Sequence, residues 1–188
     1  MAKFQKLCLC IVCVYLCGCS ADKESASVTE LFYQTPIALD TANVSMVRAF
    51  HPTELAPHLE HLVTPSFPEV VESWAEKCLI PSGAHGQTRV IIEEASICAF
   101  PVAEPQGFFA STFTTPKVQY TAQCLMTLEK KDAAKAPAYS HRIQVSVNKV
   151  AERDISAEKR DTILRTIMRE ILERLHAELI KIGAIARI

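Results

Sequence analysis

Two stretches of the chain carry apolar residues at the spacing of an amphipathic helix. In the first, apolar side chains recur three and four positions apart, directly behind Ser66 and Glu69. These two residues have the spacing of a capping box, in which a serine and a glutamate close the start of a helix. The pattern therefore predicts a helix that begins at Ser66 and is ended by Pro81 and Gly83.

The second helical stretch is much longer and lies near the end of the sequence. Its apolar residues form a stripe along residues 155–182, and charged residues occupy the other side. Ser156 is placed to cap its first turn, and Gly183 is placed to stop its last. We therefore expect one long helix that covers an apolar surface.

Four further stretches are typical of strands. The last two alternate apolar and polar side chains, as expected for a sheet with one face toward water. The predicted strands cover residues 37–50, 88–100, 118–128 and 139–150. The element order β-α-β-β-β-α predicts an α+β fold, a two-layer sandwich in which two helices cover a mostly antiparallel four-stranded sheet.

The N-terminus has the pattern of a targeting segment. Lys3 and Lys6 precede an apolar run of eleven residues, which is short beside the roughly 20 residues that a membrane-spanning helix needs. The run ends in Leu16-Cys17-Gly18-Cys19, which resembles the lipobox of bacterial lipoprotein signals. The alternatives are an ordinary cleaved signal or a short membrane anchor.

The lipobox resemblance implies how the chain is processed and divided. Cys19 would receive the lipid (diacylglyceryl, then an acyl group such as palmitate on its amine), and cleavage would remove a signal peptide of residues 1–18. The next residue is Ser20, which by the sorting rules of Gram-negative bacteria favours the outer membrane. Residues 19–35 would then be a lipidated tether, residues 36–183 a periplasmic domain and residues 184–188 a C-terminal tail.

Composition fits a single folded domain with no nucleic-acid role. The 188 residues are 49% hydrophobic and 22% charged, with a net charge of -1. A core of ordinary size is therefore available, and the basic surface that nucleic acid requires is not expected.

The cysteines divide into two groups. Five of the eight lie in the first 19 residues, so only Cys78, Cys98 and Cys124 belong to the domain. A hairpin centred on residue 111 would place Cys98 opposite Cys124, where they would form a cross-strand disulfide or pack as two small core residues.

Two loops hold the remaining candidate residues. His51, His58 and His61 occur near Glu54 and Glu60, but prolines interrupt the segment, so we expect solvated or capping histidines there and no metal site. The second loop, residues 101–117, is unusually rich in phenylalanine for an irregular segment. Its members either contact a partner or a lipid, or fold back over the end of the sandwich: Phe108, Phe109 and Phe113.

No linear motif of catalysis occurs in the sequence. There is no glycine-rich phosphate loop, no nucleophile elbow and no H-E-x-x-H, so we predict neither catalytic residues nor a cofactor. A site without a linear motif would escape this test, so an envelope hydrolase remains one alternative.

The order of elements is similar to two groups of bacterial lipoproteins. One group assembles lipopolysaccharide at the outer membrane, and the other assists ABC-type lipid transport. The resemblance implies a non-enzymatic protein that supports an assembly or transport complex, with an outer-membrane barrel or a transporter component as partner. The alternatives are a lipid-binding or small-ligand-binding lipoprotein, and a structural envelope lipoprotein.

Overall fold

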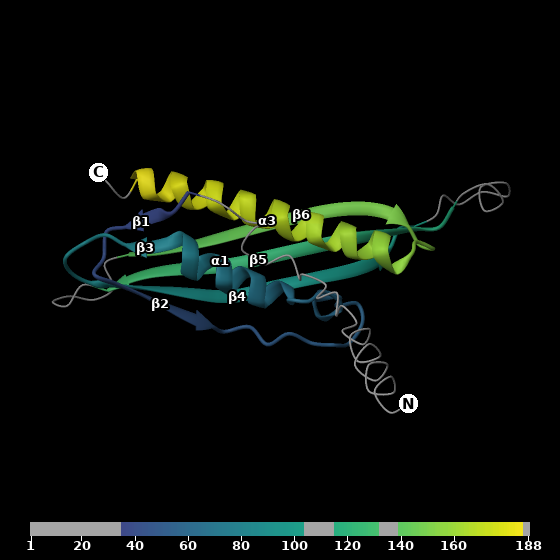
Figure 1. Ribbon diagram of the computed structural model, residues 1–188, viewed down its shortest axis with the longest axis horizontal. Coiled ribbons are helices and arrows are strands. Elements are labelled where there is room, and N and C mark those ends of the chain that lie inside the picture. The colour runs from purple at the N-terminus through teal and green to yellow at the C-terminus, as the bar shows by residue number, and fades with distance from the viewer. Residues whose placement is uncertain (1–34, 104–114, 132–138, 186–188) are drawn as a thin grey trace, which may run out of the picture.

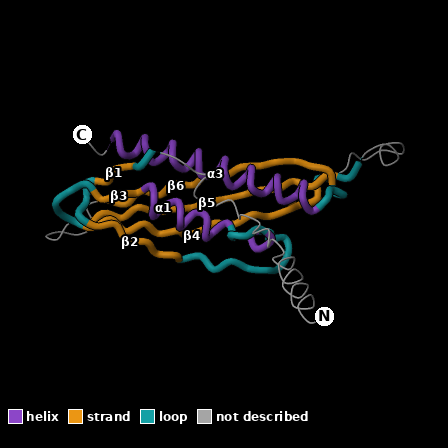
Figure 2. Tube along the Cα trace, viewed as in Figure 1, coloured by secondary structure: helices purple, strands orange, loops and turns teal. Residues whose placement is uncertain are grey.

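A computed structural model describes residues 35–103, 115–131 and 139–185. These residues form two layers, with helices on one face of a sheet of long strands (Figure 1, Figure 2). The four-stranded sheet has the order β2-β4-β5-β6, and its last three strands are antiparallel neighbours. The predicted α+β sandwich is confirmed.

The three long strands lie where strands were predicted, and each is longer than predicted. They are β4 (Gln87–Pro101), β5 (Lys117–Lys131) and β6 (Tyr139–Glu152). In β6 the burial of side chains alternates residue by residue, because one face of the sheet meets the helices and the other meets solvent.

The predicted strand over 37–50 is wrong in one respect, because the structure has two strands there. β1 (Ile37–Leu39) and β2 (Asn43–Arg48) are separated by a tight turn. At this turn the Thr41 side chain is fully buried and its hydroxyl donates to the Asn43 carbonyl. Gly83 packs against the turn so closely that a Cβ there would lie 2.5 Å from the Thr41 nitrogen.

Each of these two short strands pairs in parallel with a strand beyond the first helix. β2 pairs with β4, with Asn43 opposite Gln87. β1 pairs with β3 (Leu79–Pro81), a strand that the sequence analysis missed, to form a separate two-stranded sheet. The chain enters β3 directly from the helix. Pro81 therefore lies in a strand and is not the residue that ends the helix.

The first helix, α1 (Phe67–Cys78), begins as predicted. The capping box is present, with the Ser66 backbone N–H donating to the Glu69 carboxylate at 2.8 Å. These hydrogen bonds to Ser66 lower the pKa of Glu69. The helix buries one face against β4, including the rings of Phe67 and Trp74.

The last helix, α3 (Ala157–Ile185), lies over β6. The Ser156 hydroxyl accepts the Lys159 N–H at 3.2 Å, which confirms the predicted N-cap. Gly183 does not stop the helix, which continues to Ile185, because this glycine keeps a negative φ and so does not form a left-handed cap.

One contiguous core lies between the helices and the sheet. The side chains of α3 that face it are almost completely buried, among them Leu164, Ile167, Ile171, Leu172 and Leu175. On the sheet side the core is formed by apolar residues of the three long strands, including Val90, Ile97, Met126 and Val145.

Candidate functional site

Four predicted site residues lie outside the described part of the chain. They are the lipidation site Cys19 and the loop residues Phe108, Phe109 and Phe113. They stay predictions, and the candidate surfaces below are formed by other residues.

The predicted opposition of Cys98 and Cys124 is wrong. Cys98 pairs with Thr121 and Cys124 with Ala95, so the register of the hairpin differs by three residues from the predicted one. Register also shifts within β4, where a bulge lies between Ile92 and Glu94. Both cysteines, together with Cys78, are free thiols in this structure.

Cys98 instead lies beside two residues of the proline-rich loop. The His58 Nδ1 is 3.7 Å from the Cys98 Sγ and 3.2 Å from the Glu60 Oε1. Glu60 belongs to the short 3-10 helix η3 (Glu60–Leu62) and its side chain is fully buried. Its second oxygen accepts the backbone N–H of Ile97 at 3.2 Å.

This group has the residue types of a cysteine–histidine–acid triad but not its geometry. A triad needs one ring nitrogen toward the thiol and the other toward the acid, whereas here both partners face the same Nδ1. Burial, helped by Glu60 and Glu94, raises the pKa of the Cys98 thiol, which keeps it protonated. The arrangement therefore serves structure better than nucleophilic attack.

The other two histidines of the loop do not join this group. His51 and His61 are exposed. Within the three described ranges, no group of three or more His, Cys, Asp or Glu side chains is arranged to hold a metal ion.

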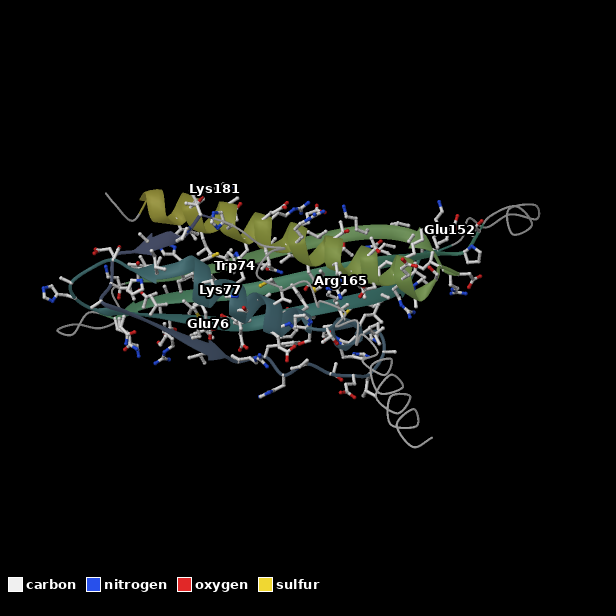
Figure 3. All side chains as sticks on the ribbon, viewed as in Figure 1. Trp74, Glu76, Lys77, Glu152, Arg165 and Lys181 are labelled. Carbon is white, nitrogen blue, oxygen red and sulfur yellow. The ribbon has the colours of Figure 1, made fainter. Side chains whose placement is uncertain are left out.

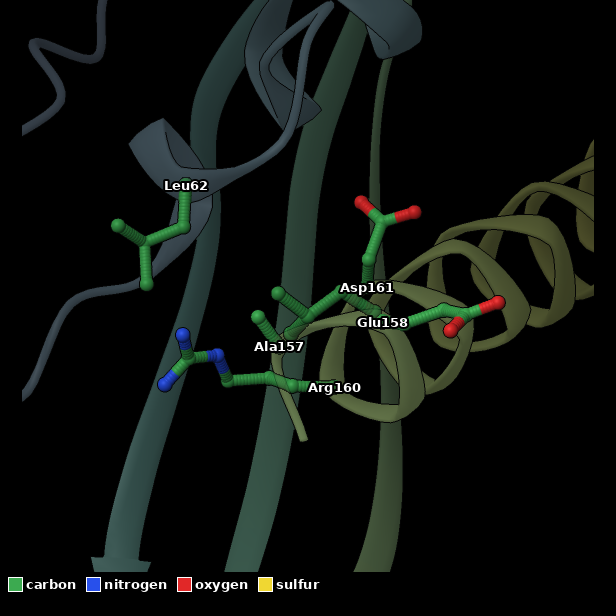
Figure 4. A pocket seen from close by; sticks show the side chains of 6 residues that line it. Leu62, Ala157, Glu158, Arg160 and Asp161 are labelled. Atoms are coloured by element: carbon green, nitrogen blue, oxygen red, sulfur yellow. The ribbon is translucent and has the colours of Figure 1, made fainter. Parts of the chain in front are cut away.

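Two hollows of the described surface lie at opposite ends of α3. The larger, of about 400 Å³, lies between η3 and the first turn of α3 (Figure 4). Exposed Leu62 and buried Leu164 form its apolar part, while charged side chains border it: Glu158, Arg160 and Asp161. Two of these side chains are acidic and one is basic.

The smaller hollow lies where β1 meets the end of α3, and has about 90 Å³ of space. Leu39, Leu128 and Leu179 line it, and the Lys130 ammonium pairs with Asp40 at 3.3 Å beside it. Ligand pockets for drug-sized molecules hold about 300–1,000 Å³, so this hollow is too small for a whole lipid.

The two edges of the sheet differ in how they are protected. On the β4 side, β2 covers the first half of the strand, and the proline-rich loop covers the second half. There the Leu59 N–H donates to the Ile97 carbonyl at 2.8 Å, and the Ala99 N–H donates to the Pro57 carbonyl at 2.9 Å. β6 forms the other edge of the sheet, and none of the described strands lies on its outer side.

Two exposed apolar residues mark the end of the sheet next to residues 104–114. Phe100 on β4 and Val150 on β6 are 47% and 56% exposed, and both are registered with Gln119 on the central strand. The sequence analysis missed them as a pair, although each falls on the solvent side of its strand's alternation.

Comparisons with known proteins found similarity only among solved structures. No protein-family profile and no curated protein matches the sequence. Rare lipoprotein B from Shewanella oneidensis aligns at a TM-score of 0.42 with 8% identity, over 78% of this chain and 99% of that chain. A minor lipoprotein from Acinetobacter baumannii aligns at 0.42 with 7% identity, over 78% of this chain and 95% of that chain.

One further observation concerns the membrane. Among the residues that the structure describes, no helix is both long and apolar enough to span a bilayer.

Proposed function

We propose that this chain is a lipid-anchored protein of a Gram-negative envelope, held at the outer membrane with its domain in the periplasm. The observation that carries the proposal is the Leu16-Cys17-Gly18-Cys19 segment at the end of a short apolar run. One lipid chain anchors a protein weakly, whereas the two or three chains of a mature lipoprotein anchor it stably. Ser20 supports the outer over the inner membrane.

Within the envelope, the domain acts as a non-enzymatic component of an assembly or lipid-transport complex. The absence of catalytic motifs in the sequence supports this role over a hydrolase. So does the one described cysteine–histidine–acid group, whose thiol is protonated and whose imidazole faces both partners with one nitrogen. The partner is an outer-membrane barrel or a transporter component, reached through the open sheet edge or the phenylalanine-rich loop.

The anchor is tested by replacing the lipidated residue. Cys19→Ser is expected to abolish labelling by a palmitate analogue and to release the protein from sedimented membranes. Cys17→Ala keeps a small residue near the cleavage site and is the matched control. This variant should still be labelled by the palmitate analogue and should still sediment with membranes. A Cys19→Ser protein that still sediments with membranes would refute the lipid anchor.

The role in a complex is tested with the lipidated full chain, purified through a C-terminal tag from solubilised envelopes. Mass spectrometry of proteins and lipids should find a barrel or transporter component at a stoichiometric level. The amount of this component that co-purifies should decrease in the Phe108→Ala and Phe109→Ala variants. Bound lipid without such a component would favour a lipid carrier. If the purification finds neither a protein partner nor a bound lipid, the proposed role is refuted.

A further inference from the structure

The outer edge of β6 presents a row of unpaired backbone groups. In an antiparallel strand, alternate residues turn both their N–H and C=O toward the same edge. The Ser146 carbonyl accepts the Arg174 Nη1 of α3 at 2.7 Å, so Ser146 faces away from β5. The backbone N–H and C=O groups of the even-numbered residues 142–150 therefore point away from β5. Within the described chain, the contact between Arg174 and the Ser146 carbonyl is the one hydrogen bond that these groups make.

The register across the sheet gives the same assignment independently. Ile97 of β4 turns its backbone toward the proline-rich loop, so it does not bond to its β5 partner Ala122. Ala122 must then bond to β6, where its partner is Val147. Val147 faces inward, and its neighbour Ser146 faces outward.

β6 lacks several of the devices that usually protect an edge strand. Exposed edges are commonly blunted by proline, by a bulge, by shortness, by a covering segment or by charged side chains. Of these β6 has only the last, since Lys149 lies on the helix-facing side of the strand and pairs with Glu170 at 2.8 Å. β6 has 14 residues without proline, and its register with β5 runs without a shift from Glu152 to Tyr139. The opposite edge has both a short strand and a covering loop. This asymmetry indicates that β6 is kept open for pairing.

The side chains of β6 are complementary to those of a second copy of the same strand. If two β6 strands run antiparallel about a twofold axis at Val147, Arg142 of each copy lies opposite Glu152 of the other. The same register places Gln144 opposite Val150 and Ser146 opposite Asn148, so no like charges meet on the open face. Opposite charges that face each other across strands stabilise the pairing.

The two charged residues are available for this contact. The Arg142 side chain is 65% exposed although it pairs with Glu93 at 2.9 Å. Glu152 is exposed at the end of β6, where Figure 3 labels it, and makes no ion pair within the described residues. A register centred on Ser146 would place Arg142 opposite Val150 and Glu152 opposite Ser140. A register centred on Asn148 would place Glu152 opposite Gln144, and Arg142 opposite Asp154, which lies beyond the end of β6.

We propose that this chain forms a homodimer by antiparallel pairing of β6 with β6 of a second copy, which joins two four-stranded sheets into one. The contact is isologous, since each copy contributes the same strand. Arg174 leaves the Ser146 carbonyl when the dimer forms and keeps its bond to Glu170, which is 2.7 Å long. The dimer does not depend on the lipid anchor, and it occupies the open sheet edge, so a partner in a complex would be reached through the phenylalanine-rich loop.

The test is native mass spectrometry of the lipidated full chain released from detergent, over a range of protein concentrations. The wild type should show a dimer that increases with concentration. Asn148→Pro removes an outward N–H without breaking a bond to β5, and should leave at least tenfold less dimer. Asn148→Ala keeps that N–H and is the matched control. Arg174→Ala should increase the dimer by freeing the Ser146 carbonyl.

A charge exchange tests the register and keeps the proposal falsifiable if the proline variant fails to fold. Arg142→Glu and Glu152→Arg should each weaken the dimer, and the double variant should restore it. A wild type that stays monomeric at all concentrations would overturn the proposal, even if the envelope purification finds a partner. So would a dimer that is insensitive to both Asn148→Pro and the charge exchange.

Discussion

The Glu60 carboxylate accepts the backbone N–H of Ile97 at 3.2 Å, and so holds the proline-rich loop against the edge of β4. Glu60 is the one fully buried acidic side chain within the described residues. A carboxylate here takes the place of a strand partner, because the Ile97 N–H points out of the sheet and no neighbouring strand reaches it. The contact explains why the loop is ordered beside a strand edge that would otherwise be open.

Replacing Glu60 should therefore destabilise the fold. Glu60→Ala leaves the Ile97 N–H buried without an acceptor, and we expect a loss of about 1–3 kcal/mol in the free energy of unfolding. Urea denaturation followed by circular dichroism measures this loss. Glu54→Ala, at an exposed position of the same loop, is the control and should change the stability by less than about 0.5 kcal/mol. Equal effects of the two variants would contradict the buried contact.

Two glycines should respond in opposite directions to the same substitution. A Cβ at Gly83 would lie 2.5 Å from the Thr41 nitrogen and 2.8 Å from the Asp40 carbonyl carbon, which are both backbone atoms. Gly83→Ala should therefore destabilise by about 1–3 kcal/mol through overpacking. Gly183 has nothing within 4 Å of such a Cβ and is helical, so Gly183→Ala should stabilise by about 0.5–1 kcal/mol. Thermal unfolding of both variants checks the signs, and a stabilising Gly83→Ala would refute the close approach.

The parts of the fold that the sequence predicted are those with long periodic patterns. Alternation over β5 and β6 and the stripe along α3 specify buried faces by themselves, because each extends over many residues. β1 and β3 have three residues each, too few to show a period, and their pairing involves a turn at Thr41 against which Gly83 packs closely. The end of α3 was misplaced because a glycine stops a helix only in a left-handed conformation.

The candidate surfaces were harder to predict than the fold. A hairpin's register is set by its loop and by bulges, so the guess that placed Cys98 opposite Cys124 failed by three residues. That Glu60 is buried, while His51 and His61 of the same segment are exposed, depends on where the loop meets β4. The open edge of β6 is likewise a property of strand order, which no local pattern in the sequence reports.

The capping box of α1 should make stability depend on pH. Hydrogen bonds to Ser66 lower the pKa of Glu69, so the ionised carboxylate stabilises the folded state. This contribution is present above the carboxyl's unfolded pKa and is lost as the pH falls through its folded pKa. The difference in unfolding free energy between the wild type and Glu69→Gln should thus be largest near neutral pH and shrink in acid. Ser66→Ala should lower the free energy of unfolding by about 1 kcal/mol, and Ser73→Ala, in the middle of the helix, is its control. A difference between the wild type and Glu69→Gln that stays constant across acid pH would contradict the lowered pKa of Glu69.

The three cysteines of the domain should react with thiol reagents in a fixed order. Burial, with a smaller effect of Glu94, raises the pKa of Cys124 to about 12, so its thiolate is absent at neutral pH. Cys98 is partly exposed at the protein surface, whereas Cys78 and Cys124 are buried. Iodoacetamide at neutral pH should therefore modify Cys98 first in the folded protein and leave Cys124 unmodified, as read by peptide mass spectrometry. All three should react after unfolding in urea without reductant, because none is in a disulfide. A Cys98 that stays blocked until reductant is added would show that it is bonded in the protein, and would overturn the free-thiol assignment.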